Sequence, residues 1–149
     1  EKLVSAKTVL MNGDVLYPPA LLKRIIESEF DSVLAVDVKE CSREEVKVIE
    51  GDGNRLVAIG KELIQENSLG EFIGVAKLSK SFCVAFSESL SRLIEAGGKS
   101  DYFEAAMQPL LDKYDVYYED VSDLPCIEID FAEDLDRAQE LVQNDLFQL

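Results

Sequence analysis

The chain has 149 residues, 47% of them apolar, and its 30 acidic and 15 basic side chains give a net charge of −15. This length and composition predict one globular domain with a buried core, while so acidic a surface disfavours nucleic-acid binding. The sequence contains no histidine, which excludes Ser-His-Asp hydrolases, Cys-His proteases and the common zinc enzymes. The chemistry that remains is that of carboxylates, lysines and metals that prefer oxygen ligands.

The cysteines and the apolar runs indicate in which cellular compartment the protein works. Cys41, Cys83 and Cys126 are far apart, odd in number and form no C-x-x-C pair, which predicts reduced thiols in a cytoplasmic protein. No apolar run approaches the length of a membrane span, so we expect no membrane partner.

The first part of the chain alternates strand, helix and strand. We expect a strand over residues 6–12, an amphipathic helix over residues 20–28 and a buried strand over residues 32–38. Pro18-Pro19 suits the start of the helix. This order and spacing predict a right-handed, parallel βαβ unit.

The middle of the chain has a different pattern. Residues 46–50 and 55–59, joined by Gly51-Asp-Gly53, predict a β-hairpin. Residues 70–78 read as another buried strand, and Ser79 as the N-cap of a helix that runs to about residue 96. Gly97-Gly98 ends this helix. We expect its buried face to contain Phe82, Phe86, Leu90, Leu93 and Ile94.

The last third predicts two helices and two strands. Asp101 is expected to cap a helix whose buried face contains Phe103, Ala106, Met107, Leu110 and Leu111. Strands are expected over residues 115–119 and 125–130, and Asp130 and Glu133 resemble a capping box before the last helix. That helix is expected to bury Leu135, Ala138, Leu141 and Val142.

These elements together predict one α/β domain over residues 1–149. We expect a mixed, mostly parallel sheet with flanking helices and a β-hairpin insertion.

Carboxylates occur where strands end or begin. Asp14 follows the first strand after an Asn12-Gly13 turn, and ligands bind at the carboxyl ends of strands in open α/β sheets. Glu128 and Asp130, at positions i and i+2, point to one face of their strand. If these two sites meet, they make an oxygen-only site of the kind that Mg²⁺ prefers. The alternatives are that Asp14 and Asp130 only cap local structure and that Glu128 faces solvent.

Other polar residues are candidates for contacts with a ligand. Tyr102 and Glu104 open a helix beside Gly97-Gly98, where they either line a pocket or, for Tyr102, half-bury at the helix start. A phosphate site needs one or two cations, and the alternative is that all the candidate lysines are surface charges. The candidates in or near the strand-rich middle are Lys39, Lys47, Lys61 and Lys77.

Three motifs in order resemble those of sugar-phosphate nucleotidyltransferases. Residues 9–14 (VLMNGD) resemble the internal "GD" strand of that family, and residues 70–79 (GEFIGVAKLS) resemble its central "GE-x-x-G" strand. Residues 126–135 (CIEIDFAEDL) resemble its closing "E-I-D-x-x-E-D-L" strand and helix. The Asp37 to Lys39 segment suits the branch of small cytidylyltransferases that activate choline phosphate, inositol phosphate or aminoethylphosphonate.

The resemblance implies a Rossmann-like nucleotidyltransferase fold and a reaction. A substrate phosphate or phosphonate would attack the α-phosphorus of a nucleoside triphosphate, with CTP favoured, and pyrophosphate would leave. Asp14 would hold the catalytic Mg²⁺, Glu128 and Asp130 would complete the metal site, and Lys39 would act with Asp14 in catalysis. Glu71 would face the acceptor substrate. From their place beside Gly97-Gly98 rather than from the resemblance, we expect Tyr102 and Glu104 to bind the substrate as well.

One part of the family pattern has no counterpart. The family begins with a Gly-rich, Arg-containing nucleotide loop followed by a Pro-Lys pair, and this sequence contains neither. We therefore expect the chain to be the C-terminal part of a larger nucleotidyltransferase domain and to be inactive alone. Association with a missing N-terminal segment or with a second copy would fit an unpaired sheet edge.

Two other function classes compete with this interpretation. A non-catalytic α/β module for ligand binding or assembly would use the same carboxylates structurally, and the missing loop is the best argument for it. A phosphatase-like Mg²⁺ hydrolase ranks last, because Asp14 has no D-x-D neighbour.

Overall fold

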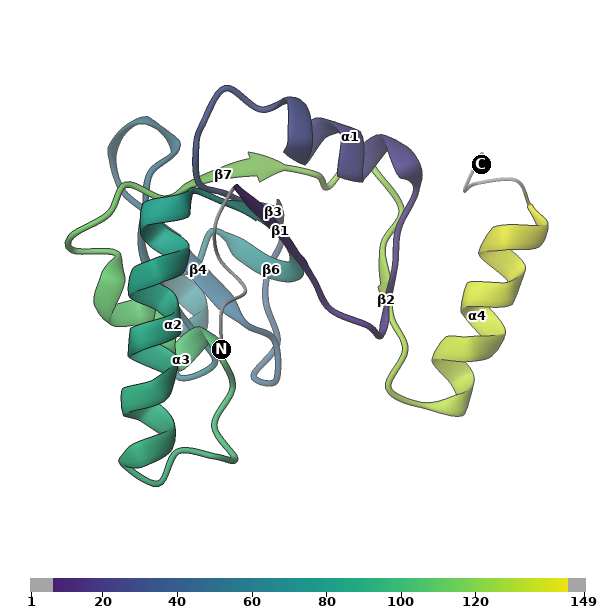
Figure 1. The fold of residues 1–149 in the computed structure, drawn as a ribbon. Helices are drawn as coiled ribbons and strands as arrows, with labels where there is room; N and C mark the ends of the chain where they lie inside the picture. Colours follow the sequence, from purple (N-terminus) through teal and green to yellow (C-terminus); the bar gives the residue numbers. More distant parts are fainter. Residues whose placement is uncertain (1–6, 145–149) are drawn as a thin grey trace.

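The structure of the protein, a computed structural model, describes residues 7–144 and divides into a sheet body and an arm (Figure 1). The sheet body is a six-stranded sheet with helices on both faces. Its elements are β1 (Thr8–Met11), α1 (Pro19–Glu27), β3 (Val33–Asp37), β4 (Lys47–Glu50), β5 (Leu56–Gly60), β6 (Gly70–Leu78), α2 (Lys80–Glu95), α3 (Glu104–Met107) and β7 (Tyr117–Asp120). The arm consists of β2 (Val15–Leu16), β8 (Ile127–Glu128) and α4 (Ala132–Gln143).

Strand β6 organises the sheet, whose order is β5-β4-β6-β3-β7, with β1 also paired to β6. Strands β1, β3 and β4 are all antiparallel to β6, and β4 and β5 form the predicted hairpin. The α/β class and the mixed sheet are confirmed, but "mostly parallel" is wrong. Within residues 7–144, β3 with β7 is the one parallel pair. The strands of the expected βαβ unit run parallel to each other but are not neighbours, because β6 lies between them.

Helix α1 covers one face of the sheet. Leu21 and Ile25 are fully buried against Val33, Ala35 and Val75, as an amphipathic pattern after a first-turn proline predicts. The predicted start of β1 at residue 6 lies outside the described residues.

Helices α2 and α3 cover the other face. The Phe82 N–H donates to Ser79 Oγ at 3.2 Å, which confirms the predicted N-cap. At the other end, Gly97 has φ 98°, and the Gly97 and Gly98 N–H groups donate to the carbonyls of Ile94 and Leu93. This is a Schellman ending and confirms the predicted stop.

Three details of the helices differ from prediction. Ile94 is about half exposed. Asp101 does not cap α3, which begins after Phe103 and gives way to a 3₁₀ turn over residues 108–110, where Pro109 lacks an N–H. The N-cap of α4 is Phe131 rather than Asp130, so only half of a capping box forms, and Asp134 rather than Glu133 accepts the Phe131 N–H at 2.9 Å.

The arm is much less buried than the sheet body. Figure 1 shows α4 apart from the sheet, and of the side chains expected to be buried only Ala138 is, whereas Leu135 is 48% and Val142 51% exposed. An amphipathic pattern predicts an apolar face but does not say what covers it. The strand expected over residues 125–130 is only β8, and it pairs with β2 instead of joining the main sheet.

All three cysteines, Cys41, Cys83 and Cys126, are free thiols. Burial, reinforced by Asp37 and Glu71, raises the pKa of Cys126 to about 12, so this thiol stays protonated at neutral pH. No helix within residues 7–144 has the length and apolar character needed to cross a membrane.

Candidate metal and acceptor site

The turn that carries Asp14 is fixed against β6. The Asn12 N–H donates to the Gly74 carbonyl at 2.8 Å, and the Asn12 side chain occupies the place where a Cβ on residue 74 would lie. Gly74 also has φ 78°, in the left-handed region that favours glycine. The second glycine of the "GE-x-x-G" motif is therefore explained by its contact with the "GD" turn.

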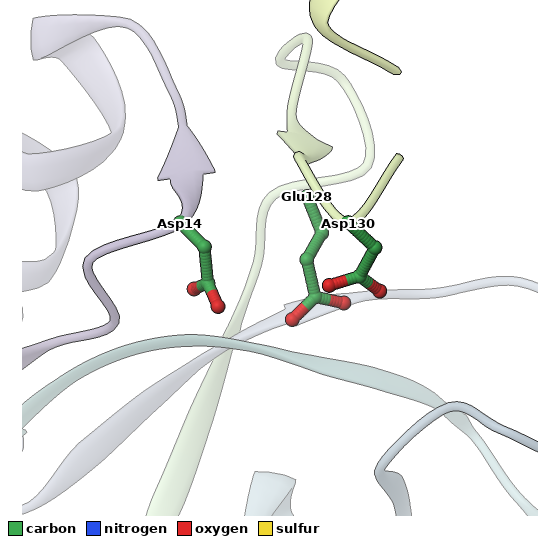
Figure 2. A group of neighbouring side chains, drawn as sticks. All are labelled: Asp14, Glu128 and Asp130. Carbon is green, nitrogen blue, oxygen red and sulfur yellow. The ribbon is translucent and has the colours of Figure 1, made fainter. Parts of the chain in front are cut away.

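Pairing of β2 with β8 brings the three predicted metal ligands together. Val15 lies opposite Glu128, and the Ile129 N–H donates to the Asp14 carbonyl at 2.8 Å. Because Glu128 and Asp130 flank Ile129, both come close to Asp14. One carboxylate oxygen from each of the three lies within 4.8 Å of the others, and Figure 2 shows the side chains pointing into one space.

This carboxylate cluster, formed by Asp14, Glu128 and Asp130, fits a divalent cation. Burial raises the pKa of Glu128, and the charges of Asp130, Glu71 and Asp14 raise it further, which shows surplus negative charge. Two oxygens on one Mg²⁺ can be at most about 4.2 Å apart, since each Mg–O bond is about 2.1 Å. The side chains are exposed and can rotate over the small remaining distance.

A second charged cluster, which we call the Lys39 cluster, lies at the β3–β6 edge. The Lys39 ammonium contacts the carboxylates of Glu71 at 2.8 Å, Glu45 at 3.2 Å and Asp37 at 3.5 Å. The register places Asp37 opposite Glu71, and Gly70 lets the strands approach closely, because a Cβ there would strike the Asp37 carbonyl.

The Lys39 cluster carries more negative than positive charge. Burial works against the charge on Lys39, but hydrogen bonds to Glu71 and Glu45 outweigh it and raise the lysine pKa. Burial is also the main reason that the Glu71 pKa is raised, even with Lys39 beside it. Because the charge of Glu71 also raises the pKa of Glu128, the two clusters share one electrostatic environment.

The two residues predicted at the start of α3 differ in exposure. Tyr102 is 59% exposed rather than half-buried. The Lys61 ammonium lies over its ring, 3.8 Å from the ring centroid. Glu104 is 4% exposed, and its Oε2 has no hydrogen-bond partner among the described residues. Burial raises the pKa of Glu104, and the charge of Lys61 partly offsets this.

The four candidate lysines have three kinds of environment. Lys47 and Lys77 are not surface charges, because both are buried and their ammonium groups donate to backbone carbonyls. Lys39 pairs with carboxylates, and Lys61 contacts Tyr102 and lines an open cavity of about 230 Å³ together with Arg43. Sequence reasoning gave Lys61 no role of its own, since no spacing connects it to Tyr102.

No protein-family model matches the chain, and no curated protein matches it in sequence. Solved structures do match. The inositol-1-phosphate CTP transferase of T. maritima is 25% identical with a TM-score of 0.64, over 97% of this chain and 58% of that one. The CTP:phosphocholine cytidylyltransferase of Streptococcus pneumoniae is 16% identical with a TM-score of 0.66, over 90% and 57%.

A third match, the UTP-bound UGPase of Acinetobacter baumannii, is 12% identical with a TM-score of 0.55, over 94% of this chain and 51% of that one. The chain thus spans slightly more than half the length of the solved proteins that it matches. Residues 7–144 have the fold of part of a nucleotidyltransferase, as the three motifs predict.

Proposed function

We propose that the chain is the metal and acceptor part of a Mg²⁺-dependent nucleotidyltransferase, with CTP as the favoured nucleotide. The carboxylate cluster carries this proposal, because three oxygen ligands from two distant segments meet beside the Lys39 cluster. Two of the matched proteins, an inositol-1-phosphate CTP transferase and a CTP:phosphocholine cytidylyltransferase, support the choice of nucleotide.

In the proposed reaction, an oxygen of the acceptor phosphate or phosphonate forms a bond to the α-phosphorus of the nucleotide. The bond from that phosphorus to the β-phosphate bridging oxygen breaks, and pyrophosphate leaves. A bound Mg²⁺ would neutralise the charge on the phosphoryl oxygens. Such chemistry needs positioning and charge neutralisation, so a chain without histidine can perform it.

The residues have distinct proposed roles. Asp14, Glu128 and Asp130 hold the metal. Lys39 acts in catalysis by holding the Glu71 carboxylate in place at 2.8 Å and by lowering the negative charge beside the metal site. Glu71 faces the acceptor, with Tyr102 and Glu104 from the start of α3.

We further propose that the chain is a single α/β domain that forms the C-terminal part of a larger nucleotidyltransferase domain in a cytoplasmic protein. Its sequence has no Gly-rich nucleotide loop, and it spans 58% of the T. maritima protein. It would then work with an N-terminal segment, or as a homo-oligomer, and would not turn over alone.

Thermal unfolding tests the metal and ligand parts of this proposal. Mg²⁺ together with CTP or with phospho-acceptors is expected to raise the melting temperature, because ligands that bind only the folded state stabilise it. Asp14→Asn should abolish the Mg²⁺-dependent rise in melting temperature. The control Asp112→Asn, which changes an aspartate outside the carboxylate cluster, should leave that rise unchanged. No shift with any pair would favour a non-catalytic module.

Phosphorus NMR tests whether the chain is incomplete. The 149-residue chain with CTP, Mg²⁺ and a phospho-acceptor is expected to release no pyrophosphate. Formation of a cytidine diphosphate ester by this chain alone would support the transfer reaction and contradict the incomplete domain.

A further inference from the structure

The loop between β3 and β4, residues 38–46, supplies two members of the Lys39 cluster, Lys39 itself and Glu45. The Glu45 carboxylate contacts the Lys39 ammonium at 3.2 Å and accepts the Ser42 N–H at 2.5 Å. The Gln65 side-chain amide donates to the Cys41 carbonyl at 2.8 Å and so ties the loop to the segment after β5. The place of Lys39 in the cluster therefore depends on the shape of this loop.

Lys47, the first residue of β4, is the buried cation beneath the loop. It is only 1% exposed, and its ammonium donates to the carbonyls of Ser42 at 3.3 Å, Arg43 at 3.1 Å and Glu45 at 2.9 Å. A lysine ammonium has three N–H donors, and here each has an acceptor. One side chain thus fixes three carbonyls within a stretch of four residues.

The strand register would allow Lys47 a different partner. Lys47 lies directly opposite Glu71 in the pairing of β4 with β6, and side chains opposite each other in antiparallel strands share a face of the sheet. Within residues 7–144, however, Lys47 forms no ion pair. Glu71 pairs at 2.8 Å with Lys39, which comes from the loop. One lysine thus shapes the loop, and the other neutralises the acid.

Lys77 offers a comparison within the same sheet. It is 7% exposed, and its ammonium donates to the carbonyls of Ile26 at 3.2 Å and Ser28 at 2.6 Å, at the end of α1. Lys77 lies six positions from Glu71 along β6, a separation of about 20 Å. The chain therefore contains two buried lysines with similar partners, of which only Lys47 holds a loop that reaches the candidate site.

We propose that Lys47 is a positioning residue for the acceptor side of the site. Its ammonium fixes the loop, Glu45 of the loop holds Lys39, and Lys39 holds Glu71 toward the acceptor. This inference rests on the proposed function for the role of Glu71. It adds a residue that acts through others rather than on the substrate.

NMR of the 149-residue chain tests these contacts with Lys47→Met and its matched control Lys77→Met. Both variants remove a buried ammonium and leave carbonyls without a donor, so both should lower stability. Only Lys47→Met is expected to speed exchange of the Ser42 amide, by about tenfold, and to shift the carboxyl carbon signal of Glu71. These two signals report the loop and the acid directly, apart from overall stability.

Titration of the Mg²⁺-loaded chain extends the test to binding, with inositol 1-phosphate and phosphocholine as probes. A probe that binds the wild-type chain should bind Lys47→Met about tenfold more weakly, the effect of losing about one hydrogen bond to a charged group. The affinity for Mg²⁺ itself should stay the same, because the proposed metal ligands lie in the arm or at its ends. Lys77→Met should change neither affinity.

Glu45→Gln tests the next contact without removing the buried cation. This variant takes away the charge that holds Lys39 but keeps the backbone carbonyls to which Lys47 donates. We expect the Glu71 carboxyl signal to shift while the ammonium signal of Lys47 stays in place. An unchanged Glu71 signal would break the proposed connection between the loop and the acid.

The outcomes separate this inference from the proposed function. Equal Glu71 shifts in Lys47→Met and Lys77→Met, or loss of Mg²⁺ binding together with probe binding in Lys47→Met, would leave Lys47 a structural role only. That result would overturn the inference with the nucleotidyltransferase proposal in place. Failure of both probes to bind the wild-type chain would contradict the proposed acceptor role. The Ser42 and Glu71 signals would then decide alone whether Lys47 positions the Lys39 cluster.

Discussion

The sheet body and the arm contribute to the same candidate site but are stabilised in different ways. The body buries apolar side chains on both faces of β6, in two clusters covered by α1 and by α2 with α3. The arm has two strands of two residues each and a helix with one buried side chain. The body is therefore held by its own core, while the arm depends mainly on the pairing of β2 with β8.

The boundary between body and arm runs through the candidate site. The three proposed metal ligands belong to the arm or its ends, whereas Lys39, Glu71, Lys61 and Glu104 belong to the body. The proposed acceptor residues thus lie on the preformed body, whereas the proposed metal ligands lie on the arm, where their carboxylates repel one another. We infer that metal binding and ordering of the arm are coupled.

The largest expected contrast is in stability. Phe82→Ala, at a 1% exposed position in α2, should lower the free energy of unfolding by about 3–5 kcal/mol. Leu135→Ala, on the exposed face of α4, should cost about 0.5 kcal/mol. Urea unfolding measures both. Equal costs would show that α4 is packed as firmly as α2 and would break the comparison.

Gly74, which contacts the turn between the body and the arm, should have the next largest effect when substituted, and Gly53 serves as its control. Gly53 has φ 65° with open space around it, so Gly53→Ala should cost about 1–2 kcal/mol for the left-handed backbone alone. Gly74→Ala should cost more, because its Cβ would also strike Asn12. It should further weaken Mg²⁺ binding by displacing Asp14, and Gly53→Ala should not. Calorimetric titration with Mg²⁺ distinguishes the two variants.

Hydrogen exchange should then report the coupling directly. Mg²⁺ at ten times its Kd should slow exchange of the β2 and β8 amides about tenfold, since opening the arm would release the ion. Amides of β3 and β6 should change little. Equal protection of arm and body would mean that Mg²⁺ stabilises the whole chain and would refute local coupling.

The smallest expected effect is that of pH. Burial raises the pKa values of Glu71, Glu104 and Glu128, so the folded state binds protons more tightly than the unfolded state. Stability without metal should therefore increase as pH falls from about 7 toward the ordinary glutamate pKa of about 4.3. Lower still, Asp31 and Asp123 lose their pairing with Lys7 and Arg24, and stability should fall again.

Urea unfolding midpoints at pH 7.5 and 5.5 measure how much stability changes with pH. Glu104→Gln should reduce this change. Saturating Mg²⁺ should reduce it as well, because the metal replaces the protons on Glu128. A midpoint that rises with pH in the absence of metal would contradict the assigned pKa directions.

The sequence predicted those features that depend on local patterns. Alternation and turn residues located the hairpin, and Ser79 and Gly97 located the ends of α2, because each acts on its own neighbours. The sequence could not predict whether Asp14 lies close to Glu128 and Asp130, because this requires pairing of segments more than 100 residues apart.

Features that depend on tertiary contacts were missed. The direction of β6 between β1 and β3 cannot be read from an apolar run, which looks the same in parallel and antiparallel sheets. The Lys77 ammonium donates to the carbonyl of Ser28, 49 positions away. The Lys47 ammonium donates to the carbonyl of Glu45 in the loop before β4, and no apolar pattern predicts the shape of that loop. The contact of Lys61 with Tyr102 joins residues 41 positions apart, and no periodicity connects them.

The central claim is that Asp14, Glu128 and Asp130 bind one divalent cation. Mn²⁺, which prefers the same oxygen ligands as Mg²⁺, broadens NMR signals close to where it binds. We predict that substoichiometric Mn²⁺ broadens the amide signals of residues 13–15 and 127–131 first, and that Asp14→Asn removes this broadening. Broadening spread over the acidic surface, or unchanged in Asp14→Asn, would contradict the claim.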